Sequence, residues 1–322
     1  MNDLRPFLRR NSVLLIFLGL VLFFGLTVEN FLTVPNLLNV VRQTSIVAIV
    51  SVGMTFAILT AGIDLSVGSL VALTGAMAAL ASARWGLPLP AVFLVALASG
   101  GLAGALNGLL VAYGGLPPFV ATLAMLAAGR GATLVITDAR PIAGLSGPFR
   151  TVGTGSMLGV PNPVWILAAV AFLAWLVLGH TRFGRHVYAL GGHEETTRLA
   201  GIEVNRLKVA VYSISGALAG LAGLILTARL NSAQPTAGVA LELEAIAAVV
   251  LGGTSLAGGS GSVLGSIVGA LIMGVLSNGL NLAGVPSYYQ QVIQGSVIVA
   301  AVVLDSLTRR RERAVSTEIL RP

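Results

Sequence analysis

Asp64 is the residue whose type and position most clearly suggest chemistry. It lies in the segment Gly62-Ile63-Asp64-Leu65-Ser66-Val67-Gly68-Ser69, between two apolar runs that are almost continuous. A charge at the centre of a bilayer costs about 2.5–3.5 kcal/mol on insertion scales, so such a residue normally faces protein or a water-filled cavity. Two compatible interpretations follow. The carboxylate caps a helix that begins near Leu65, or it lies near the path of a polar solute, together with Gly62, Ser66, Gly68 and Ser69.

Four further polar side chains lie in or beside apolar runs. Asn107 and Asn278 occupy equivalent positions in the internal repeat described below, and their amides either hydrogen-bond across helices or contact a polar solute. Glu242 and Glu244 are two residues apart, which places them on different faces of a helix. The sequence therefore predicts two solvated carboxylates at a helix start and no ion site shared between them.

Metal and nucleotide sites are not expected in this chain. His180, His186 and His193 have no acidic pair that would complete a ligand set, so they are interpreted as surface histidines. The absence of cysteine excludes disulfides, iron–sulfur clusters and thiolate zinc sites. No glycine-rich loop ends in Gly-Lys-Ser/Thr, and the single lysine is Lys208, so the chain lacks a P-loop ATP site.

The segment 180–208 is the one substantial polar stretch between apolar runs. Gly191-Gly192 is predicted to break the chain there, and Glu194 and Glu195 then begin a short helix that ends near Gly201. Acidic residues at its start and Arg198 further along suit the helix dipole. On physical grounds this segment is either a docking element for a partner or a simple connector.

The elements that position these residues are predicted from composition. The chain has 322 residues, of which 56% are hydrophobic and only 10% are charged. About 25% charged residues are usual in soluble domains, so a soluble enzyme is excluded and an all-α polytopic membrane protein is expected. Ten apolar runs are long enough to be candidate spans, the eighth being the shortest. They are 13–28, 45–60, 67–83, 89–112, 119–137, 164–179, 209–227, 244–257, 263–283 and 290–305.

The distribution of basic residues predicts the orientation of these spans. With both termini and the segment 180–208 in the cytoplasm, 13 basic residues lie inside and 5 outside, and Arg130 lies within a span. Cytoplasmic loops carry such an excess of Lys and Arg. The net charge of +7 is therefore a topology signal, and nucleic-acid binding is not expected.

The chain also repeats itself. The segment 60–65 aligns with 236–241, Asn107-Gly108-Leu109 aligns with Asn278-Gly279-Leu280, and Gly115-Leu116-Pro117 aligns with Gly284-Val285-Pro286. The matches pair spans two to five with spans seven to ten, and a displacement of five spans gives the two copies opposite orientations. Inverted repeats of this kind recur in transport proteins. The alternative is a generic small-residue packing pattern of membrane helices.

Three motifs resemble those of a known family. Glu195-Thr196-Thr197-Arg198-Leu199-Ala200-Gly201 is similar to the Glu-Ala-Ala-x-x-x-Gly coupling loop of ATP-binding-cassette (ABC) importer permeases, with Thr-Thr in place of Ala-Ala. The segments 61–69 and 241–262, together with the sequence around this loop, resemble the ribose-type monosaccharide permeases. The resemblance covers about residues 12–306.

The resemblance implies a single type II-like permease domain over residues 1–322, in a bacterial cytoplasmic (inner) membrane. A separate ATPase subunit would bind ATP and Mg and dock on the coupling loop, whose residues are Gly191, Gly192, Glu194, Glu195, Arg198 and Gly201. A periplasmic or extracellular sugar-binding protein would deliver the substrate, and the permease would pair with itself or with a relative. The sugar and the choice between homodimer and heterodimer stay open. The alternatives are an ion-coupled secondary transporter that uses Asp64 and a membrane scaffold that transports nothing.

Overall fold

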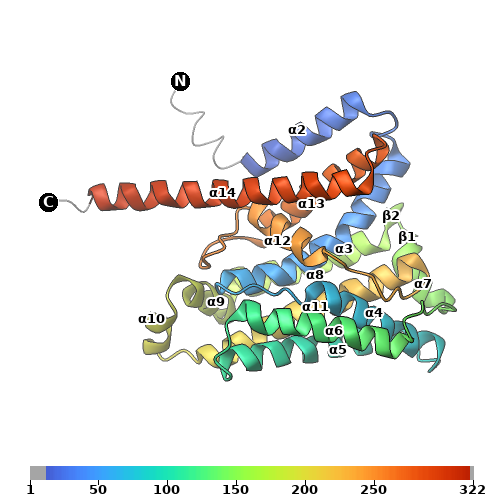
Figure 1. The fold of residues 1–322 in the computed structure, drawn as a ribbon, viewed down its shortest axis with the longest axis horizontal. Coiled ribbons are helices and arrows are strands. Elements are labelled where there is room, and N and C mark those ends of the chain that lie inside the picture. Colours follow the sequence, from blue (N-terminus) through green and yellow to red (C-terminus); the bar gives the residue numbers. More distant parts are fainter. Residues whose placement is uncertain (1–11, 320–322) are drawn as a thin grey trace.

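The computed structural model describes the backbone of residues 12–319 and the side chains of residues 13–303. Arg5, Arg9, Arg10 and Arg321, on which the predicted orientation partly depends, lie outside these residues. The helices and strands of the described residues are all helices apart from one short hairpin, in which β1 (Ser156–Met157) pairs antiparallel with β2 (Val160–Pro161) (Figure 1).

The helices follow the order of the predicted apolar runs, with short helices between some of them. Their bounds are α2 Ser12–Thr27, α3 Val34–Leu59, α4 Val67–Ala83, α5 Leu89–Ala112, α6 Pro118–Thr137, α7 Gly147–Thr154, α8 Asn162–His180, α9 Arg182–Gly192, α10 Glu194–Leu199, α11 Val204–Leu230, α12 Leu241–Leu251, α13 Val263–Leu282 and α14 Ser287–Ile319.

Each of the ten predicted runs overlaps one helix, and α4 and α5 have the predicted bounds. Within the described residues, six helices are long and apolar enough to cross a membrane: α3, α5, α6, α8, α11 and α13. The prediction for 244–257 was wrong in its bounds, because α12 begins at Leu241 and ends at Leu251. Eleven helical residues extend only about 16 Å, roughly half of the ~30 Å hydrocarbon core. Four glycines between α12 and α13, at 253, 258, 259 and 261, have positive φ values that a regular helix does not allow.

Helices α3 and α11 form the centre of the bundle. Helix α11 packs on α3, α4 and α5, while α3 packs on α12 and α13 as well as on α11. Glycines permit the closest of these approaches: a Cβ atom at Gly104 of α5 would overlap the backbone oxygen of Tyr212 on α11. Such small-residue contacts are how membrane helices gain van der Waals packing.

Both central helices end in a non-helical segment that leads to a shorter helix. Residues 60–66 join α3 to α4, and residues 231–240 join α11 to α12. Ala61, Gly238 and Ala240 adopt positive φ values of 59°, 68° and 64° in these segments. These breaks expose backbone and polar side chains inside an otherwise apolar bundle, which is tolerated only where protein or a cavity surrounds them.

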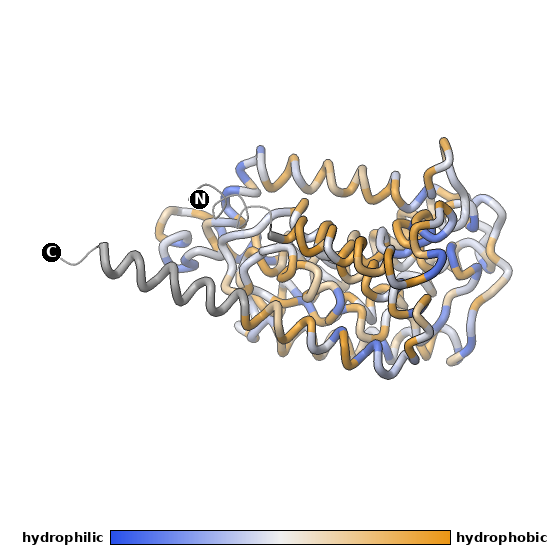
Figure 2. Tube along the Cα trace, turned by 90° about the horizontal axis from the view of Figure 1, so that it is seen from above, coloured by the Kyte–Doolittle hydropathy of each residue, from blue (hydrophilic) through white to orange (hydrophobic). Residues whose placement is uncertain are grey.

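The two ends of the bundle differ. Helices α9 and α10 lie at one end, and α7 and the hairpin lie at the other (Figure 1). Hydrophobic residues run along the helices, whereas hydrophilic residues gather mostly near the ends (Figure 2). Large apolar side chains on the outer surface, such as Leu102 and Val135, are more than 70% exposed. An apolar outer surface of this kind suits contact with lipid.

Candidate functional site: a buried polar cluster and a helical docking loop

Asp64 lies at the centre of a polar cluster that joins four parts of the bundle. Its side chain is fully buried. Oδ1 accepts hydrogen bonds from the Ser66 backbone N–H at 3.0 Å and the Ser66 hydroxyl at 2.6 Å, and Oδ2 accepts one from the Ser215 hydroxyl of α11 at 2.7 Å. Asn107 of α5 donates to the Ser66 hydroxyl at 2.9 Å, and Thr122 of α6 donates to the carbonyl of Ile63 at 3.1 Å.

The carboxylate stabilises the break itself and does not cap α4 in the usual way. Capping side chains accept an N–H from the second or third residue of a helix, whereas Asp64 accepts the N–H of Ser66, the residue that precedes α4. The local bonds hold the turn between α3 and α4, and the bond from Ser215 fixes that turn against α11. The structural interpretation of Asp64 is therefore refined. Its buried carboxylate holds the turn after α3 and joins that turn to α11 through hydrogen bonds.

Two polar atoms beside this cluster have no hydrogen-bond partner among the described residues. They are the hydroxyl of Tyr212 and the Oδ1 atom of Asn107, both on buried side chains. A Cβ atom at Gly62 would overlap the Tyr212 hydroxyl, so the absence of a side chain at Gly62 leaves room for that ring. Polar groups of this kind usually bind a partner or an ordered water.

The structure places the other predicted pathway residues in two locations. Gly62, Ser66, Gly68 and Ser69 are buried in or next to the cluster. Asn278 lies elsewhere, on α13, where it exchanges two hydrogen bonds of 2.9 and 3.0 Å with Asn36 of α3. Both asparagines thus bond across helices, but Asn278 does not join the Asp64 cluster. The side chain of Asn36, which lies outside the aligned segments, binds the Asn278 amide, whereas Asn107 binds Ser66.

Sequence reasoning missed several residues around this cluster. Ser215 and Thr122 are single hydroxyl residues in small-residue helices, where serine and threonine commonly bond their own backbone, so nothing singled them out. Glu242 was also misjudged. Its side chain is half-buried against Gly68 of α4, since a Cβ atom at Gly68 would overlap Glu242 Oε2. Glu244 is half-buried as well, so neither is a plainly solvated carboxylate.

The predicted docking loop is a helix–break–helix at one end of the bundle. Gly191 and Gly192 are the last residues of α9, so the predicted break lies one residue later, at His193. The Nδ1 atom of His193 accepts the N–H of Thr196 at 3.2 Å and caps α10. This histidine, interpreted from the sequence as an ordinary surface residue, therefore has a structural role. Gly201 ends the loop with a φ of 82°.

The two adjacent glutamates of α10 face different surroundings. Glu194 accepts hydrogen bonds from Lys208 of α11 at 2.8 Å and from Arg198 at 3.1 Å. Burial raises the pKa of Glu194, but the hydrogen bonds and positive charges of Lys208 and Arg198 outweigh burial, so the pKa lies below its ordinary value. Glu195 is exposed, and Leu199, one helical turn later, is 80% exposed. Thus α10 is fixed to α11 on one face and presents Glu195 and Leu199 on another.

The end of α9 directly contacts the last residue of α3 and the loop between α12 and α13. A Cβ atom at Gly191 would overlap the carbonyl oxygen of Leu59, at the end of α3, and the backbone nitrogen of Gly259. Gly259 itself donates to Leu59 O at 3.0 Å. The Tyr188 hydroxyl of α9 donates to Gly261 O at 3.0 Å. We call the contact of Gly191, Leu59 and Gly259 the glycine junction.

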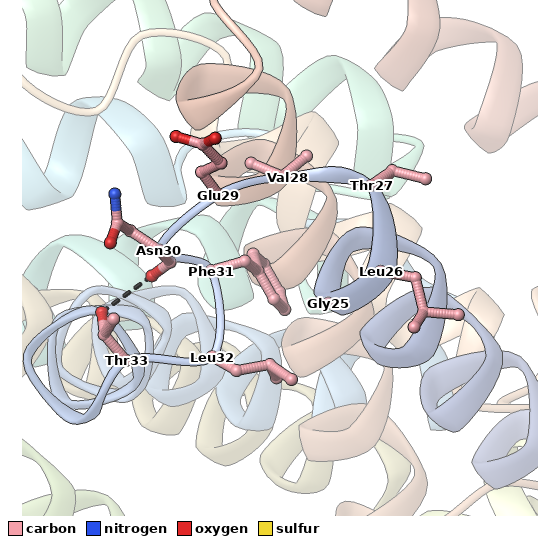
Figure 3. A pocket seen from close by; sticks show the side chains of 9 residues that line it. All are labelled: Gly25, Leu26, Thr27, Val28, Glu29, Asn30, Phe31, Leu32 and Thr33. Carbon is pink, nitrogen blue, oxygen red and sulfur yellow. Dashed lines mark hydrogen bonds between the residues drawn. The ribbon is translucent and has the colours of Figure 1, made fainter.

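Among the hollows on the surface of the described residues, one lies beside the docking loop and one in the α2–α3 loop, and neither is lined by the Asp64 cluster. One, of about 590 Å³, lies beside the docking loop between α9 and the start of α11, and is lined by Phe183, His186, Gly201, Ile202, Glu203, Arg206, Leu207 and Ala210. The other, of about 510 Å³, is formed by the nine consecutive residues 25–33 that join α2 to α3 (Figure 3). Its exposed Glu29 and Asn30 belong to one loop, so it is a surface hollow and not a path between helices.

Within the described residues, no group of three His, Asp or Glu could hold a metal ion.

Comparison with known proteins places these features in a family. Residues 36–302 match the family described as branched-chain amino acid transport system / permease component. The ribose import permease protein RbsC of Escherichia coli strain K12 is 55% identical over 274 residues, covering 82% of this chain and 84% of the relative. The D-allose transport system permease protein AlsC of the same strain is 43% identical over 265 residues, covering 82% and 81%.

A third relative, the xylose transport system permease protein XylH of the same strain, is 38% identical over 331 residues and covers 84% of each chain. No solved structure shows a significant match. The family match spans the bundle from the first turn of α3 into α14 and therefore includes both breaks and the docking loop. The chain therefore belongs to this family, whose description is branched-chain amino acid transport system / permease component.

Proposed function

We propose that the chain is the membrane-spanning permease subunit of an ATP-driven ABC importer for a monosaccharide, a ribose-like pentose or a hexose. The observation that carries this proposal is the 55% identity to a ribose import permease over four-fifths of the chain, with allose and xylose permeases among the further relatives. The chain is not an enzyme in this scheme. A separate ATPase subunit binds ATP and Mg, and an extracytoplasmic binding protein delivers the sugar.

The ATPase subunit docks on α10 and the adjoining groove. Exposed Glu195 and Leu199 supply a charged and an apolar contact, while Glu194 fixes α10 to α11 through Lys208. When ATP binding closes the ATPase pair, displacement of α10 is transmitted along two routes. The Glu194–Lys208 bond leads into α11, and the glycine junction leads into the end of α3 and the loop after α12. The two central helices therefore respond together, and the bundle alternates between outward-open and inward-open states.

The architecture we propose has about ten crossings, of which the eighth is completed by non-helical residues beside α12. It has an inverted repeat and both termini in the cytoplasm of a bacterial cell, with the chain in the cytoplasmic membrane. The packing supports the repeat: α11 packs on α4 and α5 as α3 packs on α12 and α13, and each central helix ends in a break. Residues Gly62, Asp64, Ser66, Gly68, Ser69 and Asn107 lie near the pathway. Asn278 belongs to the equivalent helix of the other repeat. The permease works as a homodimer or as a heterodimer with a related chain.

Co-purification with the cognate ATPase tests the docking assignment. The Glu195→Arg and Leu199→Asp variants are expected to lose the ATPase during affinity purification, while Glu29→Arg, a charge reversal of an exposed residue in the α2–α3 loop, retains it. Retention of the ATPase at wild-type stoichiometry by both α10 variants would contradict the assignment. Size-exclusion profiles of the purified permeases confirm that each variant is folded.

A second candidate function is an ion-coupled transporter, which the full burial of Asp64 favours. The three hydrogen bonds that Asp64 accepts fit an equally simple structural role, in which the carboxylate joins the α3–α4 break to α11. An ion-coupled transporter has no use for α10 as a docking helix, so the same co-purification experiment distinguishes the two functions.

A further inference from the structure

Arg130 is a charged residue in the body of a membrane helix, and the docking loop and the Asp64 cluster give it no role. It is the thirteenth of the twenty residues of α6 and the only charged residue in that helix. Ionisable residues at such depth almost always face the bundle interior or a water-filled cavity and mark solute pathways. The side chain of Arg130 is half-buried and turns toward protein.

The guanidinium group joins α6 to the second break of the bundle. One of its terminal nitrogens, Nη1, donates to the carbonyl of Pro235 at 3.0 Å and to that of Ala237 at 2.7 Å. Both carbonyls belong to residues 231–240, between α11 and α12. Guanidinium carries five N–H donors. Both of these bonds involve Nη1, and the other nitrogens of the group are not buried without a partner, so donors remain on its accessible side.

Glu242 lies near the carbonyls that Arg130 binds, because Gly238, the residue after Ala237, and the Glu242 carboxylate both lie against Gly68. It is the second residue of α12, and its carboxylate lies directly over Gly68 in the first turn of α4. Among the described side chains, the ion pairs all lie around α10 and the start of α11, so Arg130 and Glu242 are near each other without forming one. Both side chains are half-buried, so each keeps an accessible face on which a polar group can bind.

The first turn of α4 lies between these two charges. Gly68 contacts Glu242 on one side, and Gly129, the neighbour of Arg130, is so close to Ser69 on the other that a Cβ atom there would lie 2.8 Å from the Ser69 hydroxyl. Gly68 and Gly238 are also in close contact, because a Cβ atom at Gly238 would overlap the carbonyl oxygen of Gly68. The charges therefore flank the point at which the α3–α4 break meets the α11–α12 break.

We propose that Arg130 and Glu242 form a binding position for adjacent hydroxyl groups on the translocation path. The inference rests on the proposed function and names residues that contact the sugar. A sugar hydroxyl accepts a hydrogen bond from the guanidinium while a neighbouring hydroxyl donates to the carboxylate. A neutral polyol satisfies both charges without carrying a charge of its own, and an aliphatic solute of the same size leaves both unpaired.

The test compares sugar uptake with ATP hydrolysis in proteoliposomes that contain the permease, its ATPase and its sugar-loaded binding protein. We expect Glu242→Gln and Arg130→Gln to lower radiolabelled ribose uptake at least ten-fold, while ATP hydrolysis stimulated by the loaded binding protein stays within two-fold of wild type. Glu244→Gln, two residues further along α12, is the matched control and should leave both rates unchanged. Uptake at wild-type rates by both variants would overturn the inference.

A second measurement covers variants that fail to fold. A ribose analogue with a diazirine group is photolysed in the wild-type complex, and the labelled peptides are identified by mass spectrometry. We expect label on the peptides that carry Arg130 or residues 235–242, and competition by unmodified ribose but not by a deoxy sugar that lacks the adjacent hydroxyls. Label confined to other peptides would overturn the inference. If wild-type proteoliposomes hydrolyse ATP but take up no sugar of any kind, it is the proposed function that fails.

Discussion

Oδ2 of Asp64 accepts a 2.7 Å hydrogen bond from the hydroxyl of Ser215, a residue 151 positions later in the chain. This bond joins the break after α3, in the first half of the bundle, to the middle of α11, in the second half. Both side chains are essentially inaccessible to solvent. Because α3 and α11 are also the two central helices, any relative movement of the two halves would strain this bond.

Loss of the Ser215 hydroxyl should therefore destabilise the bundle. In Ser215→Ala one buried carboxylate oxygen loses its partner, which costs about 1–3 kcal/mol, so we expect a lower midpoint of thermal unfolding in detergent. Ser213→Ala is the matched control on the same helix, since its hydroxyl bonds only to the carbonyl of Val209 one turn earlier. Equal unfolding midpoints for the two variants would contradict the role given to the Asp64–Ser215 bond.

The glycine junction predicts a sharp difference between two neighbouring positions. A side chain at Gly191 would overlap backbone atoms of Leu59 and Gly259, whereas a Cβ atom at Gly192 meets nothing within 4 Å. We expect Gly191→Ala to reduce ATP-dependent uptake several-fold and to cost about 1–3 kcal/mol from overpacking. Gly192→Ala should retain wild-type uptake. The idea that motion passes through this junction fails if Gly191→Ala transports as well as Gly192→Ala.

The attachment of α10 to α11 should depend on pH. The pKa of Glu194 is lower in the folded protein than in the unfolded chain because Lys208 and Arg198 hold its charged form. Its stabilising contribution is thus complete above the ordinary glutamate pKa of about 4.3 and is lost as the pH falls through the lowered value. Deuterium exchange at residues 194–202 should therefore accelerate in that acidic range.

The Glu194→Gln variant checks this assignment. It should exchange rapidly at neutral pH, and the pH dependence of exchange, after correction for the intrinsic rate, should disappear. Glu195→Gln should behave as wild type, because Glu195 is exposed and takes no part in the ion pairs described around α10. A persistent acid transition in Glu194→Gln would assign it to another group.

The contact of α5 with α11 gives a prediction about packing. A Cβ atom at Gly104 would overlap Tyr212 O and approach the Cα of Gly216 to 3.2 Å, but at Gly101 it would make an ordinary 3.7 Å contact with Ala217 Cβ. Gly104→Ala should lower the unfolding midpoint by an amount that corresponds to roughly 1–3 kcal/mol. Gly101→Ala should change it by less than about 0.5 kcal/mol, as do most substitutions away from such contacts. Comparable effects at the two positions would contradict the close approach of α5 and α11.

The helices were predictable from the sequence because long apolar runs leave few other structures possible in lipid. The runs 67–83 and 89–112 match α4 and α5 residue for residue, since Pro88 and the polar residues at the ends of these runs give clear limits. The bounds of α12 were not predictable in the same way. The alanines and valines that precede Gly252 and Gly253 are as apolar as those of a span, and hydropathy does not record the positive φ of Gly253.

The candidate site was predictable only in part. Asp64 was apparent because a charge in an apolar run needs an explanation, and the Glu194–Glu195 pair because acidic residues favour a helix start. Their different orientations, one toward Lys208 and one toward solvent, depend on how α10 lies against α11. Likewise Ser215 and Glu242 acquire significance only once the fold places them beside Asp64 and Gly68, contacts between residues more than 150 positions apart.

Uptake by reconstituted vesicles tests the central claim most directly. Proteoliposomes that contain this chain, its ATPase subunit and a sugar-loaded binding protein are supplied with ATP and Mg, and entry of radiolabelled ribose, allose and xylose is measured with and without a proton or sodium gradient. We predict uptake of at least one of these sugars that requires ATP and the ATPase subunit and does not change when the gradients are collapsed. Uptake driven by an ion gradient in vesicles that lack the ATPase subunit would contradict the account.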